Sequence, residues 1–432
     1  RNENYGSVDI GKNSKVIVEH TSVNPNKALH IGHLRNVVIG DVVSRILSKV
    51  NYDVKVLNYI DDSGLQVADL IIGFRFGGFS LVPPNGEKFD HYCGDTVYVT
   101  TTANYENDKK LENKRNDVLK ELEDRNSEIA KFGKEVTRKV LAEQLKTVWN
   151  LGITYDCLNF ESDILYSELW KKIFDRMKSE NITHLETEGD NAGCWVTDVK
   201  HFHPDQGDDE KVLVRSNGVP TYIAKDIPYA AWKLGILDDP FNYVKYVTQQ
   251  DGRILYETTL DPAEPTPNFI GDKSITVIDN RQIRLQGIVG NLMAQFKAPS
   301  EYIEADYGAE YAQDIRAYIH LGYETVTLSS ETVKLLGFKT DGKDAQMSGR
   351  KGIYVNADEI IEKLQKRIFA ESKQRNSDLD DSSLNEISHN IAVGTLKYEL
   401  IKPDLGKIIT FDINTSLKLE GDTCSYIQYS CV

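Results

Sequence analysis

The feature that most constrains the fold is a strand–helix–strand pattern near the start of the chain. A β-branched run at 15–19 (KVIVE) is followed by a polar loop at 20–29 and then by a segment with an apolar residue every three to five positions. A second apolar run, 54–60 (VKVLNYI), comes next. A helix between two strands predicts a parallel pair joined by a right-handed crossover. We therefore expect an α/β fold with a parallel sheet of the Rossmann type.

Length and composition are those of a multidomain globular protein. The 432 residues, of which 40% are hydrophobic and 27% charged, correspond to about three domains of roughly 150 residues each. No apolar run approaches the roughly 20 residues of a membrane span, so we expect no membrane partner. Five cysteines without a C-x-x-C pair argue against a disulfide framework and favour a reducing, cytoplasmic setting. A net charge of −15 excludes nonspecific coating of nucleic acid, although a local basic groove is compatible with it.

The rest of the chain predicts a helical insertion and then a return to the sheet. Residues 104–150 carry a charged helical pattern, and strands are expected at 212–214, 221–224 and 274–279, the last of them before an amphipathic helix. The proline-containing stretch 241–273 is expected to be irregular. After a glycine-rich basic segment, Asn356 and Glu359 predict a capping box that opens a helix.

The strongest chemical signal is His30-Ile31-Gly32-His33, between the first strand and the first helix. A helix N-terminus presents unpaired N–H groups and a partial positive charge, which favour phosphate. Gly32 lets a nucleotide approach the backbone, and imidazoles three residues apart can donate hydrogen bonds as charge develops on a phosphate. Two histidines that merely flank a glycine are the alternative, but the strand–loop–helix context favours a nucleotide site.

With its surroundings, this motif resembles the nucleotide site of class I aminoacyl-tRNA synthetases, and in particular arginyl-tRNA synthetases of the archaeal type. The likeness is carried by 18–40 (VEHTSVNPNKALHIGHLRNVVIG), 58–68, 155–165, 220–227 (PTYIAKDI), 347–352 (MSGRKG) and 410–430, in the family's order. It implies a ligase that activates arginine with ATP and transfers it to tRNA(Arg), with activation that depends on tRNA. Magnesium would arrive with ATP, no metal would be tightly bound, and the protein would be a monomer.

The likeness also assigns a second nucleotide motif, at 346–350 (QMSGR), in which both lysines of the family's K-M-S-K-S pattern are replaced. Lys27, just before the first motif, is expected to supply the missing charge. A solvated basic loop is the alternative for the second motif. Besides the two histidines and Gly32, the residues assigned to the nucleotide are Lys27, Met347, Ser348, Gly349, Arg350 and Lys351.

A pocket for arginine needs acidic groups that accept a planar guanidinium. The residues that the likeness assigns to it are Glu19, Ser22, Asn24, Glu161, Tyr222, Asp226 and Gln282. Tyr222 would pack on the arginine stem, Asp226 would accept the guanidinium, and structural ion pairs are the alternative for the acidic residues. Gln250 competes with Gln282, which is preferred because a strand precedes it and an amphipathic helix follows it.

The likeness divides the chain into five parts. They are the first half of the Rossmann catalytic domain (1–73), a connective insertion (74–205), the second half of the catalytic domain (206–335), the phosphate-loop and stem-contact region (336–400), and the start of a C-terminal helical anticodon-binding domain (401–432). Compared with the family, an N-terminal domain that binds the tRNA elbow and most of the C-terminal domain are expected to be missing from the chain.

Two other functions compete with this interpretation. One is an H-x-G-H nucleotidylyltransferase that builds a coenzyme, although such enzymes lack the 347–352 motif. The other is an inactive synthetase-like protein that binds tRNA or protein. A metal site is not expected, because the spacing of Cys194, His201 and His203 fits no zinc pattern.

Overall fold

The computed structural model describes residues 5–198, 210–263, 267–297, 317–335, 337, 345–346, 355–376, 378–417 and 422–431. They form two compact units. Unit 1 comprises residues 1–20, 42–59 and 155–322, and unit 2 comprises residues 21–41, 60–154 and 323–432. The boundary runs through the first helix, α1 (Ile31–Lys49).

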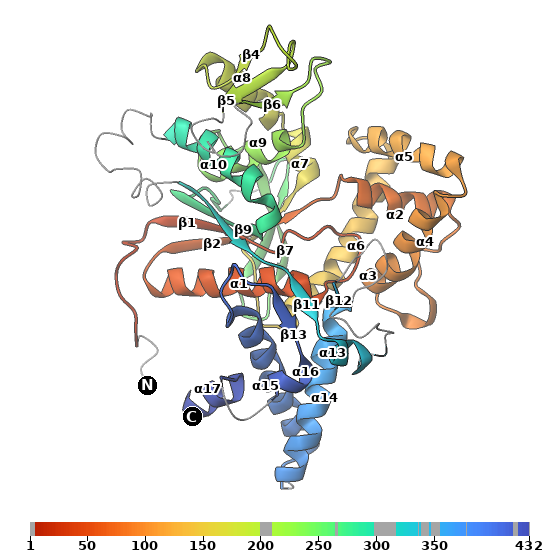
Figure 1. The fold of residues 1–432 in the computed structure, drawn as a ribbon, viewed down its shortest axis with the longest axis vertical. Coiled ribbons are helices and arrows are strands. Elements are labelled where there is room, and N and C mark those ends of the chain that lie inside the picture. Colours follow the sequence, from red (N-terminus) through yellow and green to blue (C-terminus); the bar gives the residue numbers. More distant parts are fainter. Residues whose placement is uncertain are drawn as a thin grey trace. The chain divides into compact units, whose positions relative to one another are not determined.

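Unit 1 is built on a seven-stranded sheet (Figure 1). In spatial order its strands are β10 (Tyr318–Tyr323), β9 (Lys273–Asp279), β1 (Lys15–Glu19), β2 (Asp53–Ile60), β3 (Cys157–Phe160), β8 (Ile254–Thr259) and β7 (Asn242–Thr248). β1 pairs in parallel with both β2 and β9, and β3 pairs in parallel with β8, whereas β7 pairs antiparallel with β8. The predicted α/β fold with a parallel Rossmann-type sheet is confirmed.

The central strand β1 is apolar, as is typical of a parallel strand that is covered on both faces. Val16, Ile17 and Val18 of β1 are almost completely buried, and the run of β-branched residues that predicted the strand is explained by this burial. Among the described residues of unit 1, the helices are the second part of α1, α7 (Glu161–Tyr166), α8 (Leu169–Ser179), α9 (Ile223–Lys233) and α10 (Ile283–Lys297).

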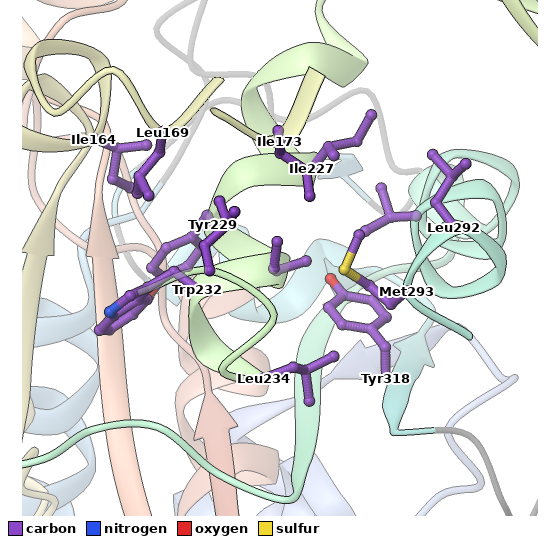
Figure 2. Packing of buried hydrophobic residues seen from close by; sticks show 14 of the residues in the cluster. Ile164, Leu169, Ile173, Ile227, Tyr229, Trp232, Leu234, Leu292, Met293 and Tyr318 are labelled. Atoms are coloured by element: carbon purple, nitrogen blue, oxygen red, sulfur yellow. The ribbon is translucent and has the colours of Figure 1, made fainter. Parts of the chain in front are cut away.

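A hydrophobic core joins α8, α9 and α10 to the sheet. On α9, the rings of Tyr229 and Trp232 are stacked with their centroids 5.5 Å apart. Figure 2 shows these rings, with Met293 of α10 beside Tyr318 of β10 on the other side of α9. This close packing fixes the position of α9. The helix is therefore a rigid support for its polar residues Asp226 and Lys233.

The structure corrects two sequence-based expectations in unit 1. Residues 221–224 were expected to form a strand, but α9 begins at Ile223, and an isolated bridge between Val214 and Pro220 ends the extended chain. The stretch 241–273 was expected to be irregular, but it contains the antiparallel pair β7 and β8. The prolines of this stretch follow β8 instead of interrupting it, so they do not remove hydrogen bonds from the pair.

A small antiparallel sheet also belongs to unit 1. Its strands are β4 (His184–Leu185), β5 (Trp195–Asp198) and β6 (Glu210–Val214), with β5 in the middle.

The first part of unit 2 is helical and has its own core. It contains α2 (Leu65–Phe76), a 3-10 turn (Pro84–Gly86), α3 (Phe89–His91), a π-helical turn (Tyr92–Tyr98), α4 (Val99–Asn104), α5 (Lys109–Leu122) and α6 (Glu128–Asn150). The predicted helical stretch 104–150 is confirmed as two helices, each opened by a side-chain cap, Asp108 for α5 and Ser127 for α6. The long helix α6 buries Val136 and Val140 in this core.

The second part of unit 2 combines a three-stranded sheet with helices. The sheet has the order β12 (Ala345–Gln346), β11 (Val326–Leu328) and β13 (Ile409–Phe411). The helices that the structure describes in this part are α13 (Ser330–Leu335), α14 (Ala357–Arg375), α15 (Asp381–Ile401), α16 (Ile413–Ser416) and α17 (Cys424–Cys431). Within the described ranges, none of the helices has the length and apolar character that crossing a membrane requires.

Candidate functional site

The first motif lies where the sequence predicts it, at the N-terminus of α1 in unit 2. His30 forms an isolated antiparallel bridge with Asn356, and α1 begins at Ile31. The backbone N–H of Ala357 donates to the carbonyl of Leu29 (2.7 Å). The chain that enters α1 is therefore fixed by backbone contacts with residues that follow the second motif.

The two histidines of the motif contact each other directly. Their rings are stacked, with centroids 3.5 Å apart, and the backbone N–H of His30 donates to Nδ1 of His33 (3.2 Å). Burial, and then the charge of Lys27, lowers the pKa of His30 to about 3. Burial also lowers the pKa of His33, with His30 and Lys27 as further causes.

Both imidazoles are therefore neutral at physiological pH. Because Nδ1 of His33 accepts a hydrogen bond, the single proton of its neutral ring is on Nε2. His33 thus offers one N–H donor of fixed position, and the positive charge beside the motif belongs to Lys27.

The loop before the motif is held by α6. Nε2 of Gln144 donates to the carbonyls of Lys27 (2.8 Å) and Asn24 (3.2 Å). Ser22 has a positive φ of 46°, and Ser22, Asn24 and Lys27 are each partly buried. The structure therefore groups the predicted residues Ser22, Asn24, Lys27, His30 and His33 on one anchored loop and helix end.

The second motif falls largely outside the described residues. Gln346 ends β12, but the predicted nucleotide residues Met347, Ser348, Gly349, Arg350 and Lys351 lie beyond what the structure describes. Their assignment stays a prediction.

The predicted acidic residues lie in unit 1. Glu19, at the end of β1, is buried and forms a salt bridge with Lys233, the last residue of α9. Thr276 of β9 contacts both partners, with its hydroxyl 3.1 Å from Oε2 of Glu19 and from Nζ of Lys233. Lys233 is only 1% exposed, so the charge of Glu19 is already balanced inside the protein.

Asp226, in the first turn of α9, lies beside this pair. Its Oδ2 accepts a hydrogen bond of 3.4 Å from Nε2 of Gln286, whose Oε1 accepts one of 2.6 Å from the hydroxyl of Tyr318. Burial, and then the charge of Glu19, raises the pKa of Asp226 to about 7, although Lys233 acts in the opposite direction. Within the described part of the chain Asp226 forms no salt bridge.

Glu161 is the third member of an acidic group that we define as Glu19, Asp226 and Glu161, and Tyr222 is the remaining predicted residue of this region. Glu161, the first residue of α7, is buried and forms a salt bridge of 3.0 Å with Lys225. Its charge also contributes to the raised pKa of Asp226. Tyr222, four residues before Asp226, is 65% exposed, and the ammonium of Lys211 lies 5.8 Å from the centre of its ring.

The glutamine that contacts Asp226 is Gln286, and the assignment of Gln282 to an arginine pocket stays a prediction. Gln282 is exposed in a 3-10 turn (Asn280–Gln282), and Gln250 is exposed in the turn between β7 and β8. Gln286, one helical turn after Gln282, is buried and contacts Asp226. Gln249 is also buried, but its amide serves the backbone of Tyr155.

Sequence reasoning therefore missed Gln286 and Lys233. Helical periodicity offered a signal for Gln286, because it follows Gln282 by four positions and lies on the apolar face of α10 with Leu285 and Val289. Lys233 gave no such signal, since its partner Glu19 is 214 residues away in sequence.

One described group has the residue types of a metal site. The ligand atoms of His184, Glu186 and Glu210 all lie within 4.8 Å of one another on the small sheet. Nε2 of His184 lies 3.6 Å from a carboxylate oxygen of Glu210 and 3.9 Å from one of Glu186, so direct contacts among the three side chains account for the group. Cys194 is a free thiol near this sheet, and His201 and His203 lie outside the described residues.

Comparisons with known proteins indicate the family to which the chain belongs. A model of the family described as tRNA synthetases class I (R), catalytic domain, matches residues 1–256. The arginine–tRNA ligase of Thermococcus kodakarensis is 32% identical over 441 aligned residues, which cover 100% of this chain and 64% of that protein. The arginine–tRNA ligase of Thermus thermophilus is 36% identical over 96% of this chain and 63% of its own length.

The solved arginyl-tRNA synthetase of Thermus thermophilus superposes with a TM-score of 0.78, at 32% identity, over 96% of this chain and 63% of that one. The chain thus spans less than two thirds of the length of each of these relatives. Because the family model covers more than half of the chain, the chain belongs to the family of class I (R) tRNA synthetase catalytic domains.

Proposed function

We propose that this protein is an arginine–tRNA ligase. The carboxylate of arginine attacks the α-phosphate of ATP, giving arginyl-adenylate and pyrophosphate. A hydroxyl of the terminal ribose of tRNA(Arg) then attacks the activated carbonyl, and AMP leaves. The relatives named arginine–tRNA ligase, at 32% and 36% identity, support this proposal.

The observation that carries the choice of amino acid is the environment of Asp226. A carboxylate in a partly buried position beside other acidic groups is expected to bind a cation or to stay protonated. Its pKa of about 7 places it at the balance between these states. A guanidinium is planar and permanently charged, so it is the cation that pairs best with such a carboxylate. In this proposal Gln286 orients Asp226. Glu19 is paired with Lys233 and does not bind the substrate itself, but its negative charge raises the pKa of Asp226.

The nucleotide is assigned to the first motif. The N-terminus of α1 provides a partial positive charge for phosphate, His33 provides an N–H donor, and Lys27 provides a full charge. The protein would act by positioning the reactants and by stabilising charge on the phosphates. Magnesium bound to ATP, a monomeric state, a cytoplasmic setting and the five-part division of the chain stay predictions.

The direct test is ATP–pyrophosphate exchange with and without tRNA(Arg). We expect exchange with arginine and none with citrulline, which has nearly the same shape but an uncharged end. Lysine, which is charged but not planar, should be a poor substrate. An inactive synthetase-like protein would bind tRNA(Arg) without exchange, and a coenzyme-building nucleotidylyltransferase would exchange without any amino acid.

The raised pKa of Asp226 predicts how arginine affinity depends on pH. The guanidinium binds the ionised carboxylate, and below a pKa of about 7 most of that carboxylate is protonated in the free protein. Affinity should therefore rise by about tenfold from pH 6 to pH 8 and then level off, because only the ionised fraction is competent to bind. Calorimetry in buffers of different ionisation enthalpy should detect the release of a proton at pH 6. Affinity that is constant from pH 6 to pH 8 would contradict the assignment.

A second expected result concerns Lys27. Its charge contributes to lowering the pKa of both histidines, so it lies close to them. Lys27→Ala should reduce kcat/KM for ATP about tenfold to a hundredfold, the effect of losing a hydrogen bond to a charged group. Lys343→Ala, in the basic segment that precedes the second motif, is the matched control and should have a much smaller effect. Equal, small effects from both variants would leave Lys27 as a loop residue only.

A further inference from the structure

A polar network lies behind the first motif in unit 2, and its centre is the start of α14. The backbone of this segment is paired with the motif, through the His30–Asn356 bridge and the hydrogen bond from Ala357 to Leu29. The position of the His30 backbone therefore depends on where residues 356 and 357 are held.

The side chain of Asn356 does not do what the sequence predicts. The capping box requires it to bond the first turn of α14, but it makes no such bond. Its Nδ2 instead donates to Nδ1 of His91 (3.0 Å) and to Oδ2 of Asp95 (3.2 Å). Asn356 is 4% exposed. Its buried amide therefore bonds to α3 and to the π-helical turn and does not cap α14.

Asp358, two residues later, makes a second set of contacts. Its Oδ2 accepts from Nζ of Lys88 (2.5 Å) and lies 3.4 Å from Nε2 of His91. Its Oδ1 accepts from the hydroxyl of Thr147 on α6 (2.9 Å). Because Nδ1 of His91 accepts from Asn356, the ring proton is on Nε2 and faces Asp358.

The helix α6 anchors both sides of the motif. Gln144 and Thr147 are three residues apart, so they lie on one face of the helix. Gln144 holds the carbonyls of Asn24 and Lys27 before the motif, and Thr147 holds Asp358 after it. The same rigid surface thus fixes the loop that enters α1 and the segment that pairs with His30.

We propose that Asn356 and Asp358 are positioning residues that set the location of His30, by joining its paired backbone to α3, the π-helical turn and α6. The proposal rests on the proposed function, since it concerns how the nucleotide motif of that ligase is held. In this proposal the helical part of unit 2, from α3 to α6, helps to hold the nucleotide motif in place. Asn356 is buried, and His91 and Asp358 are half-buried. A polar network of this kind can specify one arrangement of the backbone.

The test measures whether these residues act through His30. Asp358→Asn and Asn356→Ala should each lower kcat of arginine- and tRNA-dependent exchange by about tenfold to a hundredfold, because small displacements of a reacting group are costly, with a much smaller change in KM for ATP. Glu362→Gln, one turn further along α14 and exposed, is the matched control and should retain parent kcat. Thr147→Val, which removes a single donor from Asp358, is the mild variant if the others fold poorly.

The deciding comparison repeats the substitutions in a His30→Ala background. If they act through His30, they should reduce the remaining activity by no more than about twofold, since residues that act as a unit are not additive. An equal loss in both backgrounds would show that the network only supports the fold, and would overturn the proposal.

A readout independent of activity separates this proposal from the proposed function. In NMR spectra of the histidine-labelled chain, the imidazole signal of His30 is identified by its loss in His30→Ala. Asn356→Ala and Asp358→Asn should shift this signal, and Glu362→Gln should not. An unmoved signal overturns the positioning role even if exchange is active. A shifted signal in a chain without arginine-dependent exchange supports the positioning role and rejects the ligase function.

Discussion

Replacing His33 by Ala should slow arginyl-adenylate formation by about 10²–10³, the range for removal of one preorganised donor to a developing charge. The structural reason is that Nδ1 of His33 is occupied by the backbone N–H of His30, which leaves Nε2–H as a donor of fixed direction. Since the ring is neutral, its contribution comes from this hydrogen bond and not from charge. The measurement is exchange at saturating arginine and tRNA(Arg).

Two further variants make this expectation specific. His33→Gln places an amide N–H near the same point and should recover part of the lost rate. His389→Ala removes a half-buried histidine that contacts the carbonyl of Asn150 and should leave exchange unchanged. Arginine affinity should change little in all three variants. A parent rate in His33→Ala would remove the motif from the mechanism.

The second large effect is expected for Asp226→Asn. The change keeps the shape of the side chain but removes its charge and replaces an acceptor oxygen by a donor. Losing the partner of a desolvated guanidinium should cost about 2–5 kcal/mol of arginine binding, the range for breaking a buried charge pair. The parent's preference for arginine over citrulline should be lost, because that preference depends on the charge of Asp226. Calorimetry with both ligands measures this directly.

Stability provides the control for this variant. The folded-state pKa of Asp226 is raised from 3.8 to about 7, so the folded protein binds this proton more tightly than the unfolded chain does. The contribution of Asp226 to stability therefore falls as the pH rises from about 4 to about 7. Asp226→Asn should melt no lower than the parent at pH 8, with a smaller advantage at pH 5. If Asp226→Asn binds arginine with an affinity within about twofold of the parent, Asp226 does not determine specificity, and that role would pass to Glu161 and Glu19.

Local features of the site could be predicted from the sequence because they depend on neighbours in the chain. Apolar spacing determines β1, α1 and β2, and the helix N-terminus at His30 follows from the same pattern. The hairpin of β7 and β8 was not predicted, because an edge pair has weak alternation and the nearby prolines suggested a loop.

The partners of the charged and amide side chains could not be predicted. Gln282 and Gln286 both follow β9, and only the packing of α10 against Tyr318 buries one of them beside Asp226. Asn356 has the sequence of a helix cap, but His91 and Asp95 compete successfully for its amide. In each case the deciding atoms come from residues tens to hundreds of positions away.

The sequence by itself determined the α/β class and the position of the histidine motif at the start of α1, because short-range periodicity and a family pattern encode them. The same pattern singled out the acidic residues that we propose for arginine. Only the tertiary structure decided which of those acidic residues forms no salt bridge within the described part of the chain. Glu19 is neutralised by Lys233 and Glu161 is paired with Lys225, whereas Asp226 is left beside them with a raised pKa. The physical reason is that the cost of burying a charge depends on the groups packed around it, and chain folding brings those groups together from distant parts of the sequence.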